Sequence, residues 1–121
     1  MKRKITLLAF LILASITVNA LNYYWVGGTG NWSDYSHHCA STSGGNVFHN
    51  QVPQSTDNVF FDANSFSAAG QKATIDQTVV SCANMDWTGV THNPSLWGDY
   101  SSSLEIYGSL TLVANLNLNF F

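Results

Sequence analysis

The chain has 121 residues, of which 45% are hydrophobic and only 9% are charged, and its formal net charge is −3. Three of its four basic residues stand at the N-terminus, so the remainder offers one cation, Lys72, against seven Asp and Glu residues. One cation cannot neutralise a row of phosphates, which excludes nucleic acid as an expected partner and disfavours anionic membrane surfaces. The length predicts a single domain.

Residues 1–20 have the layout of a secretory signal peptide. Lys2-Arg3-Lys4 form a basic start, Ile5 to Val18 are apolar apart from three hydroxyl residues, and Val18-Asn19-Ala20 suits a signal peptidase. The apolar run is shorter than the roughly 20 residues that span a bilayer. We expect cleavage after Ala20, an extracellular or cell-surface location, no membrane insertion afterwards, and a mature region of residues 21–121.

The stretch YWVGGTGNWSD, from Tyr24 to Asp34, places three glycines between two tryptophans. It lacks the G-x-G-x-x-G spacing of a dinucleotide loop and the GK[ST] of a P-loop, so phosphate binding is excluded. Indole faces stack on sugar rings, and one interpretation is a carbohydrate site formed by exposed indoles. Its candidate contacts are Trp25, Trp32, Trp87 and Trp97. The favoured interpretation is structural: Trp25 and Trp32 cover the open end of a β-structure, and the glycines form turns.

His37-His38-Cys39 is the strongest candidate for a catalytic or metal site, because a Cys beside a His could act as a thiolate nucleophile or bind a metal ion. In an extended chain only His37 and Cys39 would share a side, and a site would also need His49 or His92 to lie nearby. We expect surface histidines beside a structural cysteine instead. No nucleophile-elbow pattern accompanies the Ser, His and Asp residues. The sequence therefore predicts no catalytic residue, no cofactor and no metal ligand set.

Two cysteines, Cys39 and Cys82, remain after the predicted leader. An oxidising destination favours a disulfide between them, which would contribute about 3–4 kcal/mol by the chain-entropy estimate. The alternative is two buried free thiols.

Four residues offer oxygen ligands of the kind that calcium binds: Asp57, Asp62, Asn64 and Asp86. Asp62-Ala63-Asn64 starts like an EF-hand loop, but Ser67 replaces its glycine and no glutamate closes it. Capping of backbone N–H groups in turns explains the same residues.

The middle of the chain consists of short runs rich in β-branched and aromatic residues, separated by turn formers, without a convincing helical period. The runs are Val59-Phe60-Phe61, Ala73-Thr74-Ile75-Asp76 and Thr78-Val79-Val80. Gly89 to Ser103 contains Asn93-Pro94, Gly98 and three consecutive serines, and it is predicted to be a loop.

The C-terminal run from Leu104 to Phe120 alternates apolar and polar residues in one phase, which predicts β-strand with one buried face. Its length far exceeds a usual strand of about 5–6 residues, so we expect breaks at Gly108 and near Ala114-Asn115. Leu116, Leu118 and Phe120 would then pack on one face while the strand edge stays open. We expect further chain to cover this edge.

Several segments together resemble a known group of proteins. They are Trp25 with Gly30-Asn31-Trp32-Ser33-Asp34, then Val52-Pro53 with Asp57 to Asp62, then Ala73 to Asp76, and finally Leu104 to Leu112 with its GSLTL strand. The set is similar to the N-terminal region of repetitive surface proteins and autotransporter-like passengers of Gram-negative bacteria, in particular large adhesin-like proteins of gliding-type bacteria. The resemblance covers residues 23–118 and implies a right-handed parallel β-helix. Such chains are usually longer and carry a C-terminal sorting segment.

We therefore expect an all-β protein in which residues 21–121 form the N-terminal part of a right-handed parallel β-helix with an N-terminal cap, truncated before its last coils. The expected role is structural or adhesive at the cell surface, without catalysis, with surface glycans or surface proteins as partners. The alternative is an antiparallel β-sandwich that binds carbohydrate through exposed tryptophans.

Overall fold

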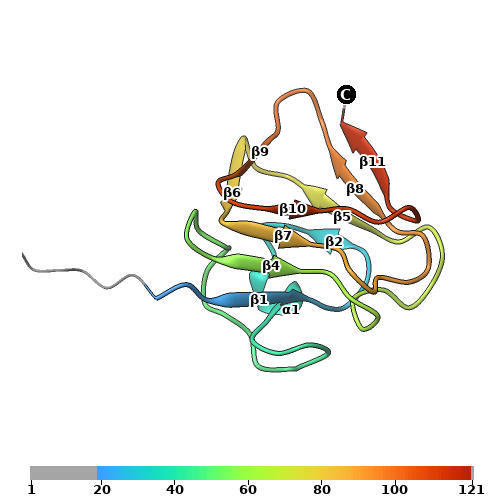
Figure 1. Cartoon of the computed structure of the whole chain (residues 1–121), viewed down its shortest axis with the longest axis horizontal. Coiled ribbons are helices and arrows are strands. Elements are labelled where there is room, and N and C mark those ends of the chain that lie inside the picture. The colour runs from blue at the N-terminus through green and yellow to red at the C-terminus, as the bar shows by residue number, and fades with distance from the viewer. Residues whose placement is uncertain (1–18, 121) are drawn as a thin grey trace, which may run out of the picture.

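The computed structural model describes residues 19–120, and it is all-β apart from one short helix (Figure 1). The predicted signal peptide therefore lies, over residues 1–18, outside the described residues. The strands are β1 Asn22–Trp25, β2 Gly30–Asn31, β3 Cys39–Ala40, β4 Asn58–Phe60, β5 Lys72–Ile75, β6 Val79–Cys82, β7 Asn84–Asp86, β8 Ser95–Gly98, β9 Ser103–Ile106, β10 Leu110–Thr111 and β11 Asn117–Phe120; the helix is α1, Tyr35–His38. Within residues 19–120, no helix has the length and apolar character needed to cross a bilayer.

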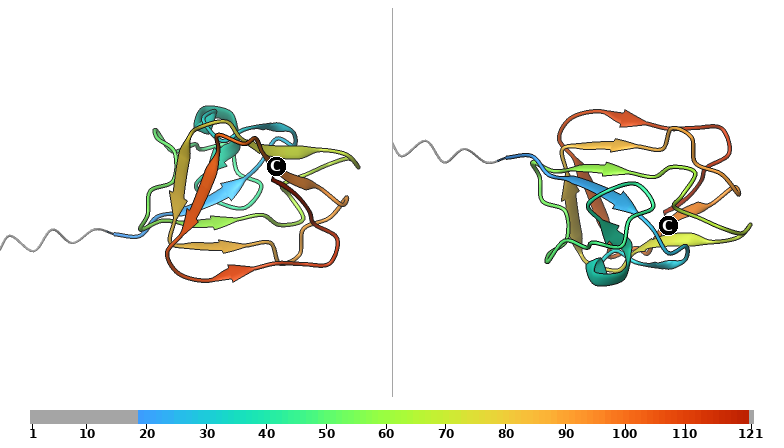
Figure 2. Two further views of the ribbon diagram at one scale, coloured as in Figure 1. Left: turned by 90° about the horizontal axis from the view of Figure 1, so that it is seen from above. Right: turned by 90° about the horizontal axis from the view of Figure 1, so that it is seen from below.

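The strands form three sheets that surround one core (Figure 2). The first sheet has the order β10-β7-β4-β1-β3, the second has the order β11-β8-β5-β2, and the third pairs β6 with β9. From β4 onward the chain visits the first, second and third sheets in turn, and then repeats this order. We call the strands of one such circuit a layer: β1 and β2, then β4 to β6, then β7 to β9, then β10 and β11.

Parallel pairing dominates this arrangement. Among the pairings between named strands, seven are parallel, and only β1 with β3 is antiparallel. The antiparallel β-sandwich expected as an alternative is therefore wrong. Neighbours in a sheet are not consecutive in the chain, because the chain passes through the other sheets before it returns; Asn58 and Asn84, for example, are 26 residues apart. Parallel neighbours require long connections of this kind.

The side chains of successive layers lie directly above one another. Tyr23, Val59 and Met85 are in register in the first sheet, and all three are buried. The residues just before them carry amides that form a chain of hydrogen bonds on the outside: Asn58 donates to Asn22 over 3.0 Å, and Asn84 donates to Asn58 over 2.8 Å. A repeated residue type at one register position thus satisfies its own polar groups along the stack.

Several predicted elements are confirmed. Strands β4, β5 and β6 coincide with the apolar runs at 59–61, 73–76 and 78–80, give or take a residue or two at each end. The C-terminal run divides into β9, β10 and β11, with a bend at Tyr107-Gly108 and a turn at Ala114-Asn115, which are the two predicted breaks.

The predicted loop from Gly89 to Ser103 is wrong, because β8 lies within it and pairs with β5 on one side and β11 on the other. Pro94 and Gly98 are turn formers by local preference. Leu96 between them is buried in register with Ala73, and packing across the stack decides the conformation.

Candidate functional site

The glycine-rich stretch that follows β1 forms turns, as the structural interpretation predicted. Gly27 and Gly28 have φ values of 82° and 70°, a region that glycine enters without strain. The indole Nε1 of Trp25 donates to the carbonyl of Gly28 over 2.8 Å. The side chain of Trp25 therefore fixes the turn that succeeds it.

His38 packs against Trp25 and the turn that follows β1. It lies at the end of α1, is buried, and stacks on Trp25 with a ring centroid distance of 4.7 Å. Its Nδ1 lies 2.6 Å from the carbonyl of Val26. Its Nε2 faces Gly30 so closely that a Cβ at this position would overlap it. The glycine at position 30 is therefore required for the imidazole to pack.

The histidines and Cys39 do not form one site. The expected surface histidines beside a structural cysteine are confirmed for exposed His37 and buried Cys39. The expectation is wrong for His38, because α1 directs its ring into the core against Trp25. His49 stacks on Tyr23 at 3.9 Å, and His92 lies on a loop after β7. Within residues 19–120 there is no group of three or more His, Cys, Asp or Glu side chains that could hold a metal ion.

Ser36, His37 and Asp34 are close together but do not have the geometry of a catalytic triad. The Nδ1 of His37 lies 2.7 Å from Asp34 Oδ1, and the same nitrogen lies 3.3 Å from Ser36 Oγ. A triad needs its Ser and its Asp on opposite ring nitrogens. The hydrogen bond from His37 lowers the pKa of Asp34 below its ordinary value, and Ser36 adds to this shift, so the cluster is an exposed carboxylate with local donors.

The two cysteines are free thiols in the structure, in contrast to the predicted disulfide. Cys39 is in the first sheet, paired with Trp25, and Cys82 is in the third sheet, paired with Ile106. Burial raises the pKa of the Cys39 thiol to about 12, with a smaller effect of the Asp34 charge, and raises that of Cys82 to about 11. Both thiols are therefore protonated and unreactive in the folded chain.

The four candidate carbohydrate contacts are not one exposed surface. Trp25, Trp32 and Trp87 are each at most 3% exposed, so their faces are closed to a ligand. Trp87 instead stacks flat against Phe61, with centroids 3.6 Å apart. Trp97 is half-buried on the second sheet, with the ammonium of Lys72 over its ring. The carbohydrate interpretation of this set is wrong for the three buried indoles.

The candidate calcium ligands accept hydrogen bonds from the chain. Asp57 is buried and accepts the N–H groups of Leu21 and Gln54 over 3.0 and 2.8 Å. Asp62 accepts the N–H of Asn64 over 2.9 Å, and Asp86 accepts that of Thr88 over 2.8 Å. These carboxylates cap turns, which is the alternative that the sequence left open.

The opposite end of the stack carries apolar side chains that no further layer covers. Leu110 is in register with buried Met85, and Leu118 with buried Leu96, yet these two leucines are 47% and 49% exposed. Leu112 and Phe120 are 47% and 43% exposed. We call these four residues the open end. Leu110 lies in β10, Leu112 directly follows it, and Leu118 and Phe120 lie in β11; among residues 19–120, each of these two strands has a partner on one side only.

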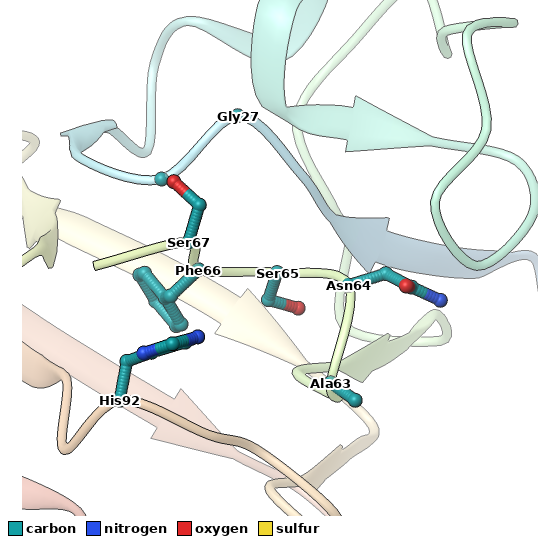
Figure 3. Close-up of a pocket in the computed structure, with 8 residues that line it drawn as sticks. Gly27, Ala63, Asn64, Ser65, Phe66, Ser67 and His92 are labelled. Atoms are coloured by element: carbon teal, nitrogen blue, oxygen red, sulfur yellow. The ribbon is translucent and has the colours of Figure 1, made fainter. Parts of the chain in front are cut away.

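An open cleft of about 520 Å³ lies where three loops leave the same edge of the first sheet (Figure 3). The loops follow β1, β4 and β7, which are neighbouring parallel strands. Figure 3 shows the loop from Ala63 to Ser67 running between Gly27 on one side and His92 on the other. The lining residues are Gly27, Gly28, Ala63, Asn64, Ser65, Phe66, Ser67 and His92.

The sequence interpretation did not identify this cleft. The sequence features that could have indicated the cleft are two turn-forming stretches, Gly27-Gly28 after β1 and His92-Asn93-Pro94 after β7. These turns meet only when the strands are known to be neighbours.

Comparison with known proteins gives no relative: no family model, no curated protein and no solved structure matches this chain.

Proposed function

We propose that the chain is the capped N-terminal end of a right-handed parallel β-helix, exported to the cell surface, where it has a structural or adhesive role without catalysis of its own. One observation carries the proposal: four layers of strands stack in parallel register, one end of the stack is covered, and the other end presents apolar side chains.

The register supports the fold assignment. Each layer places its strands over those of the preceding layer, and buried side chains align from layer to layer, as at Tyr23, Val59 and Met85. This is the packing of a repeat architecture, in which each unit contacts its neighbours alone. Connections between parallel strands of a sheet are right-handed in almost every known case, which supports the proposed hand.

The open end supports a role in extension. Complete burial of a Leu or Phe side chain contributes about 1.5–3 kcal/mol, and each of the four side chains is already about half covered. A following coil would therefore gain about 1 kcal/mol from each one, together with the hydrogen bonds of the free strand edges. A surface of this kind favours association, either with further coils or with another chain.

Two features of the sequence support export. Residues 1–20 have the three regions of a signal peptide, and the remaining chain is poor in charge and rich in Ser, Thr and Asn. Surface glycans or other surface proteins are the proposed partners. Cleavage is tested by expression in a Gram-negative host and N-terminal sequencing of the exported protein. A mature chain that begins at Leu21 supports the proposal, and an exported chain that still begins at Met1 contradicts it.

The structural role is tested by the double variant Leu112→Asp/Leu118→Asp. It introduces two charges at the open end, and we expect it to convert an associating protein into a monomer in sedimentation velocity experiments. The matched control is Val47→Asp, because Val47 is 66% exposed in the loop between β3 and β4, away from the open end.

The control is expected to associate as the unmodified chain does. If the unmodified chain is monomeric at all concentrations, or if Val47→Asp has the same effect as the double variant, the open end is not an association surface.

A further inference from the structure

We propose that the cleft between the loops after β1, β4 and β7 binds a neutral saccharide, with His92 as its principal hydrogen-bonding side chain. The inference deepens the proposed function, on which it rests for glycans as partners, by naming a site for them. The cleft itself depends neither on export nor on what covers the open end, because its three loops belong to the first three layers.

The walls of the cleft are held in place before any ligand arrives. Gly28 donates its N–H to the carbonyl of Ser65 over 3.0 Å, which joins the first loop to the second. The hydroxyl of Ser65 accepts the N–H of Asp62 over 2.9 Å. The side-chain oxygen of Gln71 accepts the N–H of Ser67 over 2.7 Å. A site that is already ordered loses less entropy when a ligand binds.

The glycine at position 28 is part of this construction. A Cβ there would lie 2.7 Å from the side chain of Gln71, and the φ of 70° already disfavours other residues. A side chain at position 28 would therefore displace the Gln71 amide, which accepts the N–H of Ser67.

His92 is in an unusual conformation at the edge of the cleft. Its φ is 72° and that of the next residue, Asn93, is 47°, so the chain bends here through two consecutive residues in the left-handed region, which glycine adopts most easily. Its imidazole is exposed and makes no hydrogen bond or ion pair with the part of the chain that the structure describes. Both ring nitrogens are thus free to contact a ligand, one as donor and one as acceptor.

The lining indicates the class of ligand. It contains no Asp, Glu, Lys or Arg, so nothing in it compensates a charged ligand. Ser67 keeps a hydroxyl hydrogen to donate, because its oxygen accepts from Gln71 over 3.3 Å. Phe66 is 3% exposed and stacks on Phe61 and Trp87, so it supports the loop and offers almost no surface to a ligand. The exposed side chains of the lining are neutral and polar, namely Asn64, Ser67 and His92, and they match sugar hydroxyls, which both donate and accept hydrogen bonds. The volume is within the range of about 300–1,000 Å³ for small-molecule sites.

The test is an NMR titration of the full ¹⁵N-labelled chain with cellotriose, maltotriose and mannotriose as neutral probes, and with trigalacturonate as the anionic comparison. We expect at least one neutral trisaccharide to cause saturable shifts at the amides of Gly27, Gly28 and Ser67 and at the His92 ring at millimolar concentrations. The absence of saturable shifts with all three, or equal binding of trigalacturonate, overturns the proposal.

The decisive variant is His92→Gly, because glycine adopts a φ of 72° without strain. We expect its melting temperature to equal or exceed that of the unmodified protein while its affinity for the saccharide falls about tenfold, the effect of one lost hydrogen bond. His92→Asn also tolerates this conformation and provides a second folded variant. His37→Ala removes an exposed histidine outside the cleft and is expected to bind normally. Unchanged affinity in both His92 variants overturns the proposal, whatever the sedimentation experiment shows for the open end.

Discussion

The two ends of the stack are built from the same kind of strand pairing, yet one end is closed and the other is open. At the closed end, α1, β3 and the turns after β1 surround Trp25, Trp32 and His38, and each of these side chains is buried. At the open end, Leu110 and Leu118 occupy the positions of buried residues in the preceding layer but remain about half exposed. Register alone therefore does not decide burial; the presence of a covering segment does.

We expect side chains at the closed end to contribute much more to the free energy of unfolding than those at the open end. The largest difference is expected between the variants Trp32→Ala and Phe120→Ala. Trp32 is 1% exposed, and removal of a buried Trp side chain costs about 3–5 kcal/mol. Phe120 is 43% exposed, and its removal is expected to cost about 1 kcal/mol. Urea denaturation followed by circular dichroism measures both. Equal losses in the two variants would mean that the ends are energetically equivalent.

A smaller difference is expected between two glycines of the second sheet. A Cβ at Gly30 meets the buried imidazole of His38, which has no room to move, and Gly30→Ala is expected to cost about 1–3 kcal/mol. A Cβ at Gly98 would lie 2.7 Å from the ring of Phe120, which is partly exposed and can rotate away. Gly98→Ala is therefore expected to cost less than about 1 kcal/mol.

The double variant Gly30→Ala/His38→Ala tests whether the imidazole of His38 is the reason that position 30 requires glycine. Removal of the imidazole should make the alanine at position 30 nearly neutral, and denaturant midpoints of the two single variants and the double variant give the coupling. Independent, additive effects would contradict the close approach.

The thiol of Cys39 at the closed end predicts a loss of stability in alkali. Its folded pKa of about 12 is above its ordinary value of 9.0, so the stabilisation from burial is complete below pH 9 and is lost as the pH rises toward 12. Cys39→Ala should remove part of this dependence in denaturant midpoints measured from pH 7 to 11. Iodoacetamide should modify both cysteines only after unfolding, and a Cys39–Cys82 linkage under non-reducing mass spectrometry would contradict the free thiols.

The smallest expected effect is at Asp34, on the exposed side of the closed end. The hydrogen bond from His37 lowers the pKa of Asp34 below 3.8, so this contribution to stability is present above that pH and is lost as the pH falls through the folded pKa. His37→Ala should move the pKa of Asp34 back toward 3.8 in an NMR titration of the carboxyl carbon. An unchanged pKa would show that the contact is absent in solution.

Local patterns predicted a good part of the fold. The apolar runs at 59–61 and 73–76 are strands, and the breaks at Gly108 and Ala114-Asn115 lie where the alternation and the turn residues place them. These features depend on neighbours in the sequence. The strand β8 was missed because Pro94, Gly98 and the serines after it favour turns locally, and only the neighbouring strands β5 and β11 hold Leu96 in the core.

The candidate sites likewise include features that the local sequence indicated and features that it did not. The sequence indicated that Trp25 and Trp32 cover one end, and it offered turn capping as one of two roles for the Asp residues, because both roles follow from residue chemistry. It did not determine the state of the cysteines or the cleft at His92.

The sequence by itself thus determined the positions of β4 to β6 and of β9 to β11, and the breaks between the last three, since these follow from the alternation of side chains along a single strand and from local turn residues. The tertiary structure decided which strands are neighbours, that the pairing is parallel, which apolar residues are covered, and which loops meet at the cleft. The physical reason is that these properties arise from contacts between residues some 25 positions apart, such as Asn84 and Ser109, and nothing in the local sequence specifies such a partner.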